Sequence, residues 1–103
     1  MLIFNTTYKV ASSITVNWLE WIQQNHIPFM LSDNQFTRPQ IAKIVGSEDE
    51  QGVSYSVQFH IANMPALMNW HKHNATQFQQ SFQKAFGNEV QFFSTVLEII
   101  DNE

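Results

Sequence analysis

An α+β fold, with two helices on one face of a four-stranded antiparallel sheet, is predicted by three features of the sequence. The chain has 103 residues, the usual size of one domain, so we expect a single domain over residues 1–103. Stretches of alternating apolar and polar residues are interleaved with stretches whose apolar residues recur at helical spacing. The resulting order is strand, helix, strand, strand, helix, strand, which is the ferredoxin-like arrangement with right-handed crossovers.

The first strand and helix occupy the first third of the chain. A strand is predicted over residues 2–10, where β-branched and aromatic residues alternate with polar ones. Ser12 or Ser13 can cap the helix that follows. The apolar stripe of this helix comprises Ile14, Trp18, Trp21, Ile22 and Phe29. Because Pro28 lacks a backbone donor and disfavours helical geometry in the residue before it, we expect the helix to end or kink near His26.

Two strands follow, joined by an acidic loop. The second strand is predicted over residues 36–45, and the loop lies between Gly46 and Gly52, where we expect an exposed hairpin connection. Residues 53–61 give the clearest strand, because apolar and polar residues alternate along all of it. We expect the helices to pack on the face formed by Val53, Tyr55, Val57 and Phe59.

The second helix and the last strand complete the pattern. Asn63 is a good N-cap and Gly87 stands where a helix ends in the left-handed conformation. A break within this helix is expected over residues 71–74, and the last strand is predicted over residues 90–100.

The sheet face opposite the helices predicts a homodimer. On the last strand Phe92, Val96 and Ile100 alternate with Phe93, Leu97 and Ile99, so one set stays uncovered when both helices pack on one face. An exposed apolar patch of that size is typical of an interface, and we expect two sheets to pack face to face. We expect the middle or the rim of that interface to hold the polar row Ser54, Ser56, Gln58 and His60.

Composition and charge exclude several classes of protein. The chain has no cysteine, so it forms no disulfide and no thiolate site. Its net charge of −4 does not supply the broad basic surface that nucleic-acid binding requires. The first residues lack the basic and apolar regions of a signal peptide, and no stretch approaches the roughly 18 apolar residues of a membrane span. We therefore expect a cytoplasmic protein with no membrane or nucleic-acid partner.

Several segments resemble a known family. They are Trp18-x-x-Trp21, His26-Ile27-Pro28, Phe36, Gly52 to Phe59, His73, Phe82, Phe86-Gly87, Thr95 and Leu97-Glu98. Together they resemble a family of small bacterial proteins known as domain of unknown function 4286, over nearly the whole chain. The resemblance implies a ferredoxin-like fold similar to that of the dimeric α/β-barrel proteins, and it implies no activity. Family members often have proline after His-Ala in the second helix, where this chain has His73-Asn74-Ala75-Thr76.

Histidines are the candidate catalytic residues. His26 follows Ile22 by four residues, on the helix face toward the sheet and near the expected helix end. It can serve as a general base at the mouth of a pocket, or its ring can satisfy the terminal carbonyls beside Pro28. His71 is the second candidate. Spacing does not support a metal site formed by His60, His71 and His73, so we predict no metal.

Aromatic side chains suggest a pocket between the helices and the sheet. At helical spacing such residues are more often core than ligand contacts. Some monooxygenases of the dimeric α/β-barrel type use an asparagine on the first strand with a tryptophan and a histidine on the second helix. Resemblance to them would involve Asn5, Trp70 and either His71 or His73. The predicted ligand-binding residues are Trp18, Trp21, His26, Tyr55, Trp70 and Phe78.

Two classes of function follow. The first is a homodimeric binding or interaction module that holds a small apolar or aromatic ligand, with no cofactor. The alternative is an enzyme similar to the dimeric α/β-barrel monooxygenases, cofactor-free or haem-dependent, or an isomerase, with His26 or His71 as the base. Low charge, many aromatic residues and the lack of paired carboxylates favour the first. A pocket that reaches His26 from solvent and is lined by Trp18, Tyr55 and Phe78 would favour the second.

Overall fold

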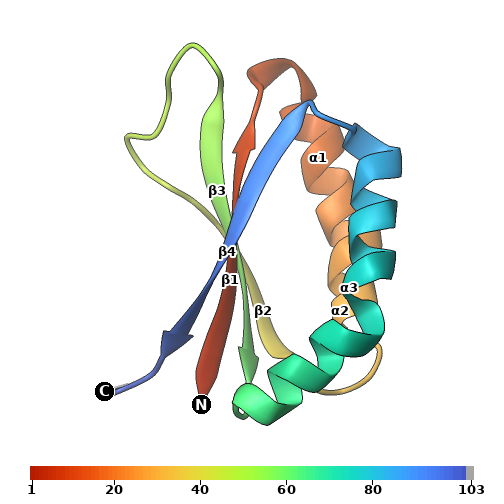
Figure 1. The fold of residues 1–103 in the computed structure, drawn as a ribbon. Helices are drawn as coiled ribbons and strands as arrows, with labels where there is room; N and C mark the ends of the chain where they lie inside the picture. Colours follow the sequence, from red (N-terminus) through yellow and green to blue (C-terminus); the bar gives the residue numbers. More distant parts are fainter. Residues whose placement is uncertain (102–103) are drawn as a thin grey trace.

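The predicted α+β fold is confirmed by a computed structural model, which describes residues 1–101 (Figure 1). Within these residues the strands are β1 (Leu2–Val10), β2 (Thr37–Lys43), β3 (Val53–Ile61) and β4 (Val90–Glu98). The helical elements are η1 (Ser12–Ile14), α1 (Thr15–Trp21), η2 (Ile22–His26), α2 (Ile27–Leu31) and α3 (Met64–Phe86). The strand order is β2-β3-β1-β4, and each neighbouring pair is antiparallel. This is the ferredoxin-like order.

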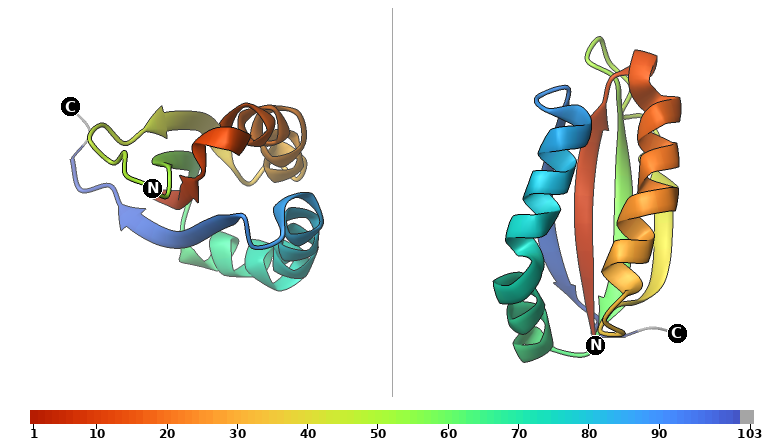
Figure 2. Two further views of the ribbon diagram at one scale, coloured as in Figure 1. Left: turned by 90° about the horizontal axis from the view of Figure 1, so that it is seen from above. Right: turned by 90° about the vertical axis from the view of Figure 1, so that its right-hand side faces the viewer.

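Both helical segments lie on the same face of the sheet, and the other face is open (Figure 1). In Figure 2 α3 runs beside the segment from α1 to α2, with the strands behind both. Since β1 and β2 run in the same direction with β3 between them, the first helical segment is a crossover connection. The helix α3 connects β3 to β4 in the same way.

The core lies between the helices and the sheet and consists mainly of aromatic residues. Its helix-facing strand residues include the predicted set on β3, since Val57 and Phe59 are buried and Tyr55 packs against the core. The largest fully buried side chains are Trp18, Tyr8, Phe36, Phe59, Ile22 and Met30. Burying side chains of this size gives roughly 1.5–3 kcal/mol each, so this layer dominates the stability of the fold.

The first helical segment, expected to end or kink near His26, does not end there, and a π turn interrupts the regular helix instead. The backbone N–H of Ile27 donates to the carbonyl of Ile22, five residues back, which closes a π-helical turn over η2. The helix then continues to Leu31, and Pro28 falls in the first turn of α2. A wider turn directly before a proline moves its ring away from the carbonyl that it would meet in a regular α-helix. The sequence around Pro28 therefore produces a π turn instead of a helix end.

The other predictions about the helices concern their caps and the continuity of α3. Neither Ser12 nor Ser13 caps α1, because both residues form the short 3-10 turn η1. The helix α3 is continuous over residues 71–74, so the expected break is absent. The cap at Asn63 is confirmed, since its Oδ1 accepts from the backbone N–H of Ala66 at 2.9 Å. Gly87 follows α3 with φ of +57°, a conformation that favours glycine.

Strand ends differ from the prediction at β2 and β4. Phe36 precedes β2, where its side chain turns into the core and is 2% exposed. Ile44 and Val45 follow the strand. The last strand ends at Glu98, so residues 99–100 do not extend its apolar row. The open face consequently carries fewer large apolar residues than the alternation predicts.

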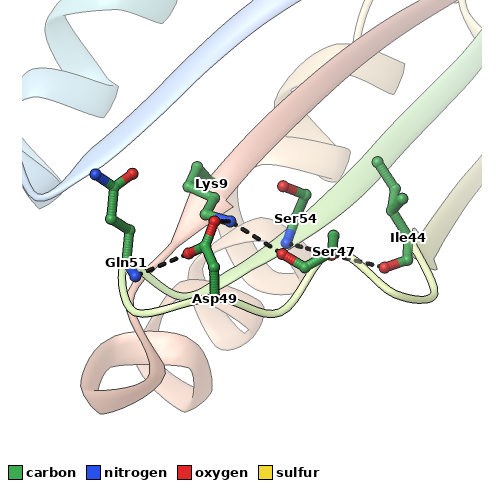
Figure 3. A network of polar contacts seen from close by, with 6 residues as sticks. All are labelled: Lys9, Ile44, Ser47, Asp49, Gln51 and Ser54. Carbon is green, nitrogen blue, oxygen red and sulfur yellow. Dashed lines mark hydrogen bonds and ion pairs between the residues drawn. The ribbon is translucent and has the colours of Figure 1, made fainter.

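The loop between β2 and β3 is tied to the open face of the sheet by a lysine (Figure 3). Nζ of Lys9 donates to the backbone carbonyl of Ser47 at 3.0 Å and to Oδ2 of Asp49 at 2.8 Å. Oδ1 of Asp49 accepts from the backbone N–H of Gln51, and Oγ of Ser47 donates to the carbonyl of Ile44. Glu48 pairs with Lys43 at 2.9 Å. Two of the acidic side chains of this loop, Glu48 and Asp49, are therefore paired with lysines of the neighbouring strands.

None of the helices in residues 1–101 combines the length and the apolar character that crossing a bilayer requires.

Candidate functional site

A cavity of about 520 Å³ lies between the first helical segment and α3. This volume falls in the range of small-molecule sites. The first segment contributes Trp21, Asn25, His26 and Phe29, and α3 contributes Phe78, Ser81, Lys84 and Ala85. His26 is 4% exposed, whereas Asn25, Ser81 and Lys84 are exposed residues. The cavity therefore has a buried histidine in its wall and polar groups where it meets solvent.

The π turn determines where the His26 ring lies. His26 is the last residue of η2, and the turn adds one residue before Pro28. Its ring stacks on the Trp21 indole, with centroids 5.8 Å apart and an interplanar angle of 9°. Phe78 of α3 lies 5.0 Å away, and Phe59 of β3 meets the ring edge-on at 5.9 Å. Three aromatic side chains from three elements thus hold the imidazole.

Burial keeps His26 neutral. Desolvation lowers the pKa of its imidazole from the ordinary 6.5 to about 4, because the charged form loses its water. Nδ1 is sealed from solvent and has no hydrogen-bond partner among the described residues. No backbone carbonyl in residues 1–101 bonds the ring, so the ring does not satisfy the helix carbonyls beside Pro28. Since the ring also lines the cavity, Nε2 is the nitrogen that can meet an occupant.

Three of the six predicted ligand-binding residues meet at this cavity: Trp21, His26 and Phe78. Trp18 and Tyr55 do not line it. Trp18 is fully buried, and its indole packs on the Tyr55 ring at 5.1 Å. The two tryptophans of the first helix therefore differ in their surroundings: Trp18 is core, and Trp21 is a half-buried cavity wall.

Trp70 and His71 lie elsewhere, beside a groove between the first half of α3 and β4. Trp70 is buried against Phe4 and Phe36. His71 is exposed and has no positioned partner among the hydrogen bonds of the described residues. The second catalytic candidate thus lacks the enclosed surroundings of the first.

The asparagine, tryptophan and histidine of the monooxygenase resemblance are not brought together. Asn5 lies on the open face of the sheet, opposite Gln58 and Thr95 on the neighbouring strands. Trp70 packs on Phe4, which points to the helix side. The sheet therefore separates the two side chains within one chain. Nor do His60, His71 and His73 form a cluster, since residues 1–101 contain no group of three or more potential metal ligands.

Sequence reasoning missed the polar wall of the cavity. Asn25 and Phe29 follow Trp21 at intervals of four residues, and Ser81, Lys84 and Ala85 follow Phe78 at intervals of three and four. Each set forms one stripe along its helix. The stripes could have been found from this spacing, but only the packing of the two helices shows that they face each other.

Haem does not fit this donor set. A histidine that ligates a metal almost always donates its other ring N–H to a carboxylate, a carbonyl or water. Nδ1 of His26 is sealed and has no such partner in the described part of the chain. The cavity is thus better suited to an organic molecule than to a haem whose iron would be bound by His26.

Fold and cavity together define a ferredoxin-like α+β protein with a ligand-sized space between its two helical segments. The chain belongs to the family described as Domain of unknown function (DUF4286), whose model matches residues 1–100. The family resemblance of the sequence is thereby confirmed. No curated protein matches the chain.

A solved structure is also similar to this chain. It is a crystal structure of a "putative antibiotic biosynthesis monooxygenase" from Deinococcus radiodurans. The sequences are 13% identical, the match covers 100% of this chain and 96% of the other, and the TM-score is 0.68. At this identity the likeness shows the fold alone.

Proposed function

We propose that this protein is a homodimeric binding module that holds a small apolar or aromatic molecule in the cavity beside His26. A single observation carries the proposal: a histidine that is 4% exposed stands in the wall of a 520 Å³ cavity, with one ring nitrogen sealed and unpaired. Leaving a buried polar group unpaired costs about 1–3 kcal/mol. An apolar side chain would pack between the same rings without that cost, so a ligand-binding role explains why histidine stands there.

The second part of the proposal is that two copies pair through the open sheet face. Phe93 is 62% exposed and Leu97 is 44% exposed on this face, and both are large apolar residues of β4. Between the strands, Nδ2 of Asn5 donates to Thr95 at 3.1 Å, and the Ser56 hydroxyl donates to Oδ1 of Asn5. Because these polar groups already bond one another, covering them with a second sheet costs little desolvation.

The alternative function is an enzyme in which His26 acts as the base. The fold shared with the Deinococcus radiodurans protein supports it. A histidine with a pKa of about 4 is unprotonated at neutral pH but is a weak base. None of the described residues that line the cavity has a carboxylate to strengthen it. The geometry therefore favours binding over proton abstraction.

Native mass spectrometry of gently purified protein tests the proposal. We expect a species of twice 12.0 kDa that carries extra mass, which is removed when the Ala85→Phe substitution fills the cavity. An unliganded 12.0 kDa monomer at micromolar concentration would contradict both parts. A cytoplasmic location stays a prediction, to be checked by fractionation of expressing cells.

A further inference from the structure

We propose that the cavity beside His26 selects an aromatic carboxylate: a flat ring system that bears one anionic group. This inference rests on the proposed binding function and names the chemical class of its ligand. It depends on three properties of the cavity, which are its flat aromatic walls, the direction of its hydrogen-bond donors and the sign of its charge.

The walls favour a planar ring. Trp21, Phe29 and Phe78 line the cavity from both helical segments. Aromatic faces and edges pack best against another ring at centroid distances of about 4.5–7 Å. Ser81 and Ala85, which also line the cavity, have small side chains that take up little of its space. An aromatic molecule would complete the cluster in which Trp21 already contacts Phe82 and Phe86 edge-on.

Each polar side chain of the cavity, Asn25 included, can donate at least one hydrogen bond. A buried N–H without a partner is rarer in proteins than an unpaired acceptor, so we assign the proton of His26 to Nε2 and leave the sealed Nδ1 bare. Nε2–H then offers a donor to the occupant. The Ser81 hydroxyl and the Lys84 ammonium add further donors at the rim. A ligand that presents oxygen acceptors is favoured by this arrangement.

The charge of the cavity is positive, although the chain carries a net charge of −4. Among the residues of the described chain that line it, Lys84 is the one that carries a charge. The ion pairs found within residues 1–101 involve Lys9 and Lys43, and Lys84 takes part in neither. Because burial keeps His26 neutral at pH 7, the anion would be held by Lys84. One cation with several donors matches a single carboxylate.

Isothermal titration calorimetry with a matched pair of probes tests this inference. The probes are 2-naphthoate and its neutral counterpart 2-naphthamide, which share the ring but differ in charge. We expect 2-naphthoate to bind about tenfold more tightly in low salt, with a smaller difference at high salt. Lys84→Gln should abolish this preference, because it should weaken 2-naphthoate binding far more than 2-naphthamide binding. The control Lys72→Gln, on the same helix but outside this cavity, should keep the preference.

The outcomes separate this inference from the proposed function. Equal affinity for the two probes in the wild-type protein would overturn the carboxylate selectivity and leave a binding cavity for flat molecules. Binding of neither probe at millimolar concentration would overturn both. Binding that survives the Ala85→Phe substitution would place the ligand outside the cavity and would also contradict the inference. Loss of binding in Ala85→Phe supports the inference when the control Ala62→Phe, in the loop before α3, binds as the wild type does.

Discussion

The two faces of the sheet differ in the hydrogen bonding of their polar side chains. On the helix-covered face, Tyr8 and Trp18 are fully buried, yet the Tyr8 hydroxyl and the Trp18 indole N–H have no hydrogen-bond partner in the described chain. On the open face, Asn5 bonds Thr7, Ser56 and Thr95 through its side-chain amide. The covered face is thus rich in aromatic packing and leaves the Tyr8 and Trp18 polar groups unpaired, although its Thr6 bonds Ser94. On the open face the Asn5 amide is fully engaged with its neighbours.

This difference shows which force determines each side. Ring centroids on the covered face lie 4.7–6.4 Å from one another, the extremes being the contacts of Phe82 with Phe92 and with Phe78, so shape decides which residues stand there. Burial raises the pKa of the Tyr8 hydroxyl, because its anion would lose all hydration. His26 shares this unpaired state but also adjoins a cavity. It is therefore the buried polar group of the covered face that lines the cavity.

The largest expected effect comes from removing a core ring of the covered face. Trp18→Ala should lower the free energy of unfolding by about 3–5 kcal/mol, because the space of a fully buried indole is left unfilled. Val16→Ala on the same helix is the matched control, since Val16 is 69% exposed. It should change stability by less than about 0.5 kcal/mol. Urea unfolding measures both, and equal effects would refute the assignment of Trp18 to the core.

A pH effect of nearly the same size should come from His26. Its pKa of about 4 in the folded chain lies below the ordinary 6.5 of the unfolded chain, so the unfolded state binds more protons between these values. Stability should fall as the pH drops from about 6.5 to about 4, by about 3 kcal/mol in all. The groups that face the ring are Trp21, Phe59 and Phe78, which do not titrate, and the cavity cation Lys84.

The variant His26→Phe isolates this contribution. It should keep the stability that the wild type loses over this range, so the difference between their urea midpoints should change with pH. A constant difference from pH 7 to pH 4 would mean that the ring is not buried as a neutral group.

Hydroxyl removal should act with opposite sign on the two faces. Tyr8→Phe removes an unpaired buried hydroxyl and should leave stability unchanged or raise it by up to about 1 kcal/mol. Thr95→Val removes an acceptor of the Asn5 amide and should cost about 0.5–1 kcal/mol. Thermal unfolding of the two variants side by side checks the contrast. A loss of stability in Tyr8→Phe would show that its hydroxyl has a bonding partner, such as a buried water.

The smallest effect is expected at the loop that Lys9 ties to the open face. The Asp49 carboxyl is not buried, and the hydrogen bond that it accepts from Lys9 lowers its pKa. The Lys9–Asp49 pair stabilises the fold at pH values above the pKa that the carboxyl has in the unfolded chain. This stabilisation is lost as the pH falls through the lower pKa that the carboxyl has in the folded chain. Because the pair is exposed, Asp49→Asn should leave the unfolding midpoint at pH 7 nearly unchanged. A clear drop in that midpoint would show that the loop is part of the cooperative core.

Much of the fold could be predicted because strand patterns are local. The bounds of β1 and β3 match the prediction, since strict alternation fixes both the face and the length of a strand. The π turn could not be foreseen, because Pro28 allows either a helix end or a wider turn, and packing of the following residues on the core decides between them. Met30 lies in the helix after the π turn and is 1% exposed. A helix that ended at His26 would lose this burial.

The candidate site was only partly predictable for a similar reason. Trp18 and Trp21 are neighbours on one helix, and helical spacing alone does not show which one faces the sheet. By contrast, the separation of Asn5 from Trp70 follows from the alternation of side chains along β1, where successive residues point to opposite faces of the sheet. Phe4 points to the helices, so Asn5 must point away from them.

The central claim is that the covered face holds the ligand and the open face holds the second copy. Native mass spectrometry of two variants tests it most directly. We predict that Phe93→Lys, on the open face, gives a 12.0 kDa monomer that still carries ligand mass. Ala85→Phe, in the cavity, should give a dimer without ligand mass. A dimer that survives Phe93→Lys, or ligand mass that survives Ala85→Phe, would contradict this division of roles.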